Sequence, residues 1–272
     1  MTLWRYHLGV HKTATTHIQR VLEYQREELL AQGIDYIPLE ELRFTAEPVF
    51  WRWPFKRARF RRVIRSDAPV VILSEENWLG LVQDACVCPV YPNLEKRLNI
   101  VHRPNARAFL SIRNPADFAA SAYSEAMRHS PNEISLERTR DAFLSAGGVW
   151  TELVERVQRY FPNLRVWPYE NYRGNEQAYI SLITGAQLTV PRISDPSETA
   201  RLPAETIEML EQMRRSGEYL PKAEATPFPR IATRFEMFSD EERRELTNLY
   251  ERELEVLKQN GVLVMDINSP VS

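Results

Sequence analysis

The residues whose types and spacing suggest chemistry lie near the start of the chain, between Gly9 and Thr16. A glycine, a lysine and three threonines separate an apolar run from an amphipathic, helix-like pattern. Where a buried strand turns into a helix, an anion meets free backbone N–H groups and the positive end of the helix dipole. The Lys12 ammonium group adds charge and the hydroxyls add hydrogen bonds, so the segment predicts a phosphate or sulfate site. The threonines are Thr13, Thr15 and Thr16.

This loop is not a Walker A motif. That motif has a second glycine directly before its lysine, whereas no other glycine stands between Gly9 and Lys12. The shorter loop leaves less room for a triphosphate. The alternative interpretation is an ordinary polar turn, in which Thr13 caps the helix that follows.

A second polar segment follows the apolar run Ala108–Ile112. Asn114 suits the N-cap of a helix and Pro115 suits its first position. Arg113 is then expected at the carboxyl edge of the sheet, where open α/β sheets bind ligands, and its planar guanidinium can hold two phosphate oxygens. Ser121 follows about two helical turns later. Taken singly, such a segment is more often a structural helix cap, whereas its combination with the Lys12 loop favours the phosphate site.

Apolar runs of strand length alternate with helical patterns along the chain. This alternation predicts an α/β fold with a central, mostly parallel sheet covered by helices on both faces. The expected strands are Leu3–Val10, Val70–Ser74, Ala108–Ile112 and Leu164–Tyr169. The first helix is expected to run to about Gln32, with one face formed by Ile18, Val21, Leu22 and Leu29.

The last third of the chain is predicted to be mainly helical. We expect helices at Pro203–Ser216 and Ser239–Gln259, and Gly261 suits the position just after the second one. All 272 residues are assigned to one domain.

The composition is that of an ordinary globular protein, with 43% apolar and 26% charged residues. The formal net charge of −2 gives no overall field that would make a nucleic acid an expected partner. Cys86 and Cys88 stand too close for an unstrained disulfide and lack the further ligands of a zinc site. No run approaches the roughly 20 apolar residues of a membrane span. We therefore expect a cytoplasmic protein without a membrane span.

Both polar segments resemble motifs of the sulfotransferase family. Residues 9–16, Gly-Val-His-Lys-Thr-Ala-Thr-Thr, resemble the family's 5′-phosphosulfate-binding loop, commonly written Lys-x-Gly-Thr-Thr. Here Ala14 replaces the glycine, which costs stability if the position needs a positive φ. Residues 111–123 resemble the 3′-phosphate motif, in which a serine follows a strand-ending arginine by eight positions, as Ser121 follows Arg113. Weaker similarity extends to residues 70–78 and 166–170, which resemble family strands ending in Ser-x-Glu and Tyr-Glu.

The resemblance implies a P-loop-like, three-layer fold of bacterial sulfotransferase type. It also implies 3′-phosphoadenosine 5′-phosphosulfate as the donor, and no metal. Lys12 is assigned to the leaving phosphate and the bridging oxygen, where negative charge develops. The residues expected to bind the nucleotide are His11, Lys12, Thr13, Ala14, Thr15, Thr16, Arg113 and Ser121.

A general base is expected to accept the proton of the acceptor group. Glu75 is the first candidate because it directly follows the expected strand Val70–Ser74, beside the crevice. The alternative is a solvated or salt-bridged carboxylate, and the neighbouring Glu76 stays open as well. His11 is the second candidate for catalysis, because a histidine titrates near neutral pH. The remaining rivals are His17 and His102.

A basic, aromatic stretch spans residues 51–65. The favoured interpretation is an amphipathic helix with Phe60, Val63 and Ile64 toward the core and solvated arginines outside. The alternative is a surface for an acidic sugar, a phosphorylated acceptor or a nucleic acid backbone.

The sequence thus predicts a sulfotransferase that acts on a hydroxyl or amine of an unidentified carbohydrate, lipid or small molecule. One alternative is a P-loop kinase or NTPase, although no magnesium-binding aspartate follows an apolar strand. Another is a non-catalytic domain that binds a nucleotide or an anion. Neither the acceptor nor the oligomeric state is indicated.

Overall fold

The computed structural model describes residues 2–52, 55–191, 201–218 and 233–264. In these ranges five strands form one sheet, entirely parallel, in the order β2-β3-β1-β4-β5. The chain connections reverse direction on either side of the central β1, which pairs with β3 and β4. A parallel sheet binds ligands at this kind of point, beyond the carboxyl ends of the strands. The strands are β1 (Leu3–His7), β2 (Ile34–Tyr36), β3 (Val70–Ser74), β4 (Arg107–Ile112) and β5 (Asn163–Pro168).

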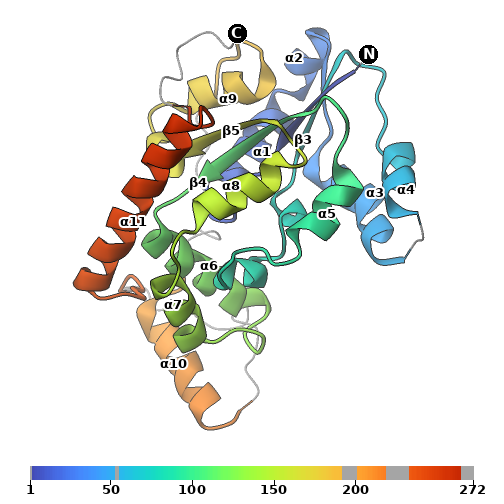
Figure 1. Ribbon diagram of the computed structural model, residues 1–272. Helices are drawn as coiled ribbons and strands as arrows, with labels where there is room; N and C mark the ends of the chain where they lie inside the picture. Colours follow the sequence, from blue (N-terminus) through green and yellow to red (C-terminus); the bar gives the residue numbers. More distant parts are fainter. Residues whose placement is uncertain (1, 53–54, 192–200, 219–232, 265–272) are drawn as a thin grey trace.

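Two apolar cores cover the two faces of the sheet. Successive side chains of a strand point to opposite faces, so Tyr6 belongs to one core while Arg5 and His7 lie on the other side. One layer contains α1 (Thr15–Tyr24), α2 (Arg26–Ala31) and α9 (Glu176–Thr184). The opposite layer contains α5 (Leu94–Val101), α6 (Pro115–His129) and α8 (Trp150–Gln158), as Figure 1 shows.

The remaining elements flank these layers. Ser239 and Glu242 form a capping box at the start of α11, and Gly261, with a φ of 67°, follows its last turn. No helix in the described ranges is long and apolar enough to cross a membrane. The other helices are α3 (Leu39–Arg52), α4 (Lys56–Val63), α7 (Leu136–Leu144), α10 (Ala204–Arg215) and α11 (Asp240–Gln259). Short 3-10 turns cover Glu76–Trp78, Val82–Cys86 and Tyr169–Asn171.

The structure confirms the predicted α/β class, with its central parallel sheet, helices on both faces and helical C-terminal part. The strand predicted at Val70–Ser74 has those bounds, and the two C-terminal helices lie within a residue of those expected. Asn114 caps α6 through its side chain, which accepts a hydrogen bond from the Ala116 N–H, and Pro115 opens the helix.

Two predicted elements are corrected. The first strand ends at His7 rather than Val10, although the N–H of Val10 still donates to Ser111 O at 3.3 Å. The helix expected to reach Gln32 is two helices, divided at Gln25. This residue is buried, and Nε2 of its side chain donates to Thr189 O at 2.6 Å. This bond holds Gln25 at the junction.

Candidate functional site

The loop between β1 and α1 turns sharply through three residues with a positive φ. These are Gly9 (41°), Lys12 (65°) and Ala14 (62°). A Cβ on Gly9 would lie 2.4 Å from Cγ2 of Thr15, so only glycine fits there. Lys12 and Ala14 have a Cβ, and for such residues the left-handed conformation costs roughly 1–2 kcal/mol. The loop is therefore strained at these two positions. Ala14, which stands where the motif that it resembles has glycine, thus adopts a left-handed conformation.

The first turn of α1 presents backbone donors at the carboxyl edge of the sheet. The first helical bond runs from the Ile18 N–H to Ala14 O, so the N–H groups of Thr15, Thr16 and His17 precede the helical ladder. Ala14, not Thr13, occupies the N-cap position. Thr13 is buried, and its hydroxyl donates to Val10 O at 2.6 Å, which closes the loop from inside.

Lys12 is held over α6 by a carboxylate. Its Nζ lies 3.2 Å from Oε2 of Glu125, and the lysine side chain is only 12% exposed. Burial lowers the pKa of Lys12 below its ordinary value, and Glu125 opposes this change. Burial alone would raise the pKa of Glu125, but Lys12 and His129 outweigh it and hold that pKa low. The ammonium group is therefore positioned by an ion pair at the edge of the loop.

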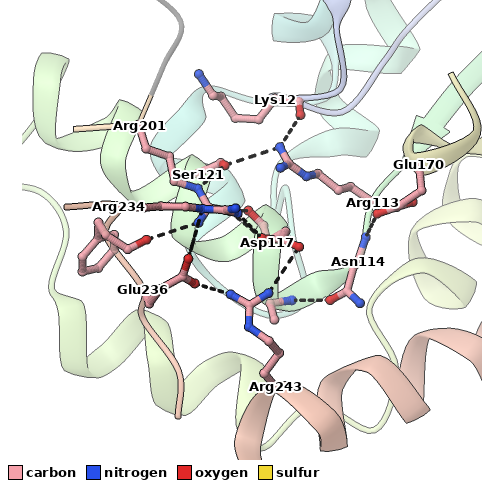
Figure 2. A network of polar contacts seen from close by, with 12 residues as sticks. Lys12, Arg113, Asn114, Asp117, Ser121, Glu170, Arg201, Arg234, Glu236 and Arg243 are labelled. Atoms are coloured by element: carbon pink, nitrogen blue, oxygen red, sulfur yellow. Dashed lines mark hydrogen bonds and ion pairs between the residues drawn. The ribbon is translucent and has the colours of Figure 1, made fainter. Parts of the chain in front are cut away.

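Arg113 connects the Lys12 loop to helix α6. Its Nη1 donates to the backbone carbonyl of Lys12 at 2.9 Å and to Oγ of Ser121 at 3.4 Å (Figure 2). The guanidinium also stacks over the ring of Tyr169, 4.8 Å from its centre. The adjacent Glu170 carboxylate accepts from the Asn114 N–H at 2.8 Å. The four separate segments that resemble family motifs are thus adjacent, since Glu75 also donates its N–H to His7 O at the end of β1.

Three further arginines reach the same helix from the C-terminal part of the chain. Arg201 donates from Nε to Oγ of Ser121 at 2.8 Å and from Nη2 to Oδ1 of Asp117 at 2.8 Å. Arg234 and Arg243 lie 2.7 and 3.3 Å from carboxylate oxygens of the same Asp117 (Figure 2). Burial alone would raise the pKa of Asp117, but Arg201 first, and then Arg243 and Arg113, hold it below its ordinary value. No local motif marks their contacts with α6, because Ser121 and Asp117 stand 80 or more residues away from these arginines.

Glu75 is buried in a two-point ion pair. Nε and Nη2 of Arg43 donate to its two carboxylate oxygens at 2.7 and 2.9 Å, and the N–H of Asn77 donates at 3.0 Å. Burial raises the pKa of Glu75 above its ordinary value, and the bonds from Arg43 oppose that rise. Glu76 also contacts Arg43, at 3.2 Å, and accepts from Nε2 of Gln19 at 2.9 Å. The salt-bridged alternative therefore describes how Glu75 is held in this structure.

His11 is enclosed by hydrogen bonds on both ring nitrogens. Nδ1 lies 2.9 Å from the Tyr91 hydroxyl, which also accepts from the His11 N–H, and Nε2 lies 3.3 Å from Oδ1 of Asn77. The pattern fits a neutral ring that donates through Nε2. Burial lowers the pKa of His11 to about 4. The ring therefore braces the loop in this structure.

The other two histidines differ in position. His17 lies in the first turn of α1, where its Nδ1 is 2.8 Å from the Tyr172 hydroxyl. His102 follows α5 and precedes β4, so it lies at the amino edge of the sheet, away from the Lys12 loop. Its Nδ1 is 3.1 Å from Nη2 of Arg57.

The basic stretch forms α4 with the predicted apolar face. Phe60 and Ile64 are buried and Val63 packs against the same core. Arg57 and Arg61 contact His102, which places this helix near the amino edge and not beside Lys12. Residues 53–54, and the side chains of 51 and 52, lie outside what the structure describes.

Metal ligands do not gather in the described ranges: no group of three or more His, Cys, Asp or Glu side chains is arranged to hold a metal ion. Cys86 and Cys88 are both free thiols.

Comparison with solved structures finds a distant similarity. No family model matches the sequence, and no curated protein matches it with significance. A sulfotransferase from Alicyclobacillus acidocaldarius, known from its crystal structure, is similar to this chain with a TM-score of 0.42 and 17% sequence identity, over 79% of this chain and 92% of that one.

Proposed function

We propose that the chain is a sulfotransferase that uses 3′-phosphoadenosine 5′-phosphosulfate as its donor. The observation that carries the proposal is the position of Arg113, whose guanidinium bonds both the Lys12 loop and Ser121. Two sites suited to phosphate are thereby joined at one edge of the sheet. A nucleotide phosphorylated at both its 5′ and 3′ positions requires this arrangement, whereas ATP requires only the first of the two sites.

The side chains around the loop have properties that suit this donor. The free N–H groups of Thr15 and Thr16, together with the helix dipole, would hold the 5′-phosphosulfate. Arg113, Ser121 and Arg201 would hold the 3′-phosphate, because two guanidinium groups already converge on one hydroxyl. The donor would supply the sulfuryl group, whose bond to the bridging phosphate oxygen breaks as the acceptor bonds to sulfur.

Lys12 and Glu75 are the proposed catalytic residues. The Lys12 ammonium group stabilises the negative charge that develops on the leaving phosphate, which is the largest contribution expected of such a site. Glu75 accepts the proton of the acceptor hydroxyl or amine. Burial raises its pKa, which favours acceptance of a proton, and its carboxylate must first exchange a bond with Arg43. His11 supports the loop from below through Tyr91 and Asn77.

Nucleotide binding tests this proposal directly. We expect calorimetry to give at least tenfold higher affinity for 3′-phosphoadenosine 5′-phosphate than for ADP, because only the former engages Arg113 and Ser121. A preference for Mg-ATP would instead support a kinase or NTPase. Binding of the bisphosphate nucleotide without release of sulfate or sulfated product, over a panel of hydroxyl and amine acceptors, would support a non-catalytic domain.

A further inference from the structure

A second cluster of cations lies at the amino edge of the sheet, opposite the Lys12 loop. Arg5 and Arg107 are register partners in the parallel strands β1 and β4. On β5, Asn163 pairs with Arg107, and Arg165 follows two residues later. Because register partners in parallel strands point to the same face, the three guanidinium groups share one side of the sheet. They line a cavity of about 270 Å³.

Arg5 is the buried member of this cluster, with 7% of its surface exposed. Nε and Nη2 donate to Ile183 O at 2.6 Å and Leu182 O at 2.7 Å, at the end of α9. The guanidinium also lies 5.1 Å from the centre of the Phe109 ring. These contacts fix the side chain, but none of them is a carboxylate. A buried cation without an anionic partner is costly.

Neighbouring residues add to this positive charge and do not cancel it. Burial and the nearby Arg107 lower the pKa of Arg5 to about 10. The Arg107 side chain makes no hydrogen bond or ion pair with any residue that the structure describes, and the Arg165 side chain only approaches Gly261 O at 3.5 Å. The cavity lining contains no aspartate or glutamate, while Gln158, Asn163 and Asn260 contribute neutral amides.

We propose that this cavity is a binding site for a small oxyanion with two or more negative charges. Guanidinium groups match the planar or tetrahedral oxygens of carboxylates and phosphates, and three of them converge where no carboxylate of the protein is present. The volume lies just below the lower end, about 300 Å³, of ordinary small-molecule sites. An ion the size of pyrophosphate or citrate fits this volume better than a nucleotide. The site is independent of the proposed sulfotransferase function.

Backbone amide NMR on the full chain tests the site and separates it from the Lys12 loop. Gly261 lines the cavity and Gly9 lies in the loop, so one titration reports on both edges. With pyrophosphate and, separately, citrate, we expect saturable shifts of the Gly261 amide. The stronger of the two probes identifies phosphate or carboxylate as the preferred chemistry. In the variant Arg107→Gln/Arg165→Gln, the affinity read at Gly261 should fall at least tenfold.

The controls keep this result interpretable. Arg252→Gln removes an exposed arginine of α11 outside the cavity lining, and it should leave the affinity at Gly261 unchanged. If the double variant does not fold, Arg107→Gln alone serves, because the Arg107 side chain makes no hydrogen bond or ion pair with the described residues. This single variant should still weaken binding several-fold. Shifts confined to Gly9, or equal affinity at Gly261 in the wild type and the folded variant, would overturn the proposal.

Discussion

The two edges of the sheet both gather cations, but they balance the charge differently. At the carboxyl edge three cations are each matched by a carboxylate of the protein, while Arg113 is held by the Lys12 carbonyl and the Ser121 hydroxyl. At the amino edge, the Arg5 side chain donates to backbone carbonyls, and the Arg107 side chain bonds to no described residue. The matched pairs at the carboxyl edge are Lys12 with Glu125, Arg43 with Glu75, and Arg201 with Asp117.

This difference separates two ways of preparing for an anion. Paired cations at the carboxyl edge are held in place before a ligand arrives, which suits a site where position decides the rate. The ligand must then replace existing ion pairs, and their loss offsets part of the binding free energy. Unpaired cations at the amino edge attract an anion without such exchange, which suits simple binding. The following variants test the contrast, beginning with the largest expected effect.

Removal of the Lys12 ammonium group should have the largest effect. In Lys12→Ala we expect turnover to fall about 10²–10³-fold, the usual loss when one group that stabilises developing negative charge is removed. The affinity for 3′-phosphoadenosine 5′-phosphate should fall about tenfold at most. Sulfate-transfer rates measure the turnover, and calorimetry measures the affinity. Lys96→Ala, which changes an exposed lysine of α5, is the matched control. Undiminished turnover in Lys12→Ala would remove this residue from the mechanism.

Arg113→Gln should weaken binding in a way that depends on the 3′-phosphate. A hydrogen bond to a charged group contributes about 1.5–3 kcal/mol, so the affinity for 3′-phosphoadenosine 5′-phosphate should fall about 10–100-fold. Adenosine 5′-phosphosulfate lacks the 3′-phosphate, and its affinity should change only a few-fold. Calorimetry with both ligands measures the difference, with Arg252→Gln as the control. Equal losses for the two ligands would mean that Arg113 acts only by supporting the Lys12 carbonyl.

The sequence predicted those parts of both edges that depend on local signals. Residues Val70 to Leu73 form a continuous apolar run between Pro69 and the polar pair Ser74 and Glu75, so the strand Val70–Ser74 was predicted to the residue. Asn114 and Pro115 are a local signal for a helix start, and this signal placed Arg113 at the end of the preceding strand. In contrast, β2 has only three residues, too few to show a pattern. Arg201 contacts a partner 80 residues away, so tertiary packing alone brings it to Ser121.

The pH dependence of stability should reveal the two histidines buried at the carboxyl edge. Burial lowers the pKa of His11 to about 4 and that of His7 to about 3, against about 6.5 when unfolded. Between these values the unfolded chain binds protons that the folded chain does not, so stability falls as the pH drops below 6.5. We expect a loss of about 2 kcal/mol per histidine between pH 6.5 and 5.

Urea unfolding at several pH values measures this loss. His11→Gln should remove about half of the slope between pH 6.5 and 5, whatever it does to stability at pH 7. A slope that is as steep in His11→Gln as in the wild type would show that His11 is charged or solvated in the folded protein.

The smallest effect concerns backbone strain, which also differs between the edges. Next to the amino-edge cavity, the left-handed positions are glycines: Gly185 has a φ of 75° and Gly261 of 67°. In the Lys12 loop, the corresponding conformation is imposed on Lys12 and Ala14. Ala14→Gly should relieve roughly 1–2 kcal/mol of strain. Glycine's greater freedom in the unfolded chain offsets about 0.5–1 kcal/mol of this.

We therefore expect Ala14→Gly to raise the free energy of unfolding by about 0.5 kcal/mol, measured in urea. Ala178→Gly, at a helical position of α9, should instead lower it by about 1 kcal/mol. The opposite signs separate strain relief from the general effect of glycine. If both variants destabilise equally, Ala14 is not strained. If only Ala14→Gly stabilises while donor affinity stays constant, the strain belongs to the backbone of the loop and does not assist nucleotide binding.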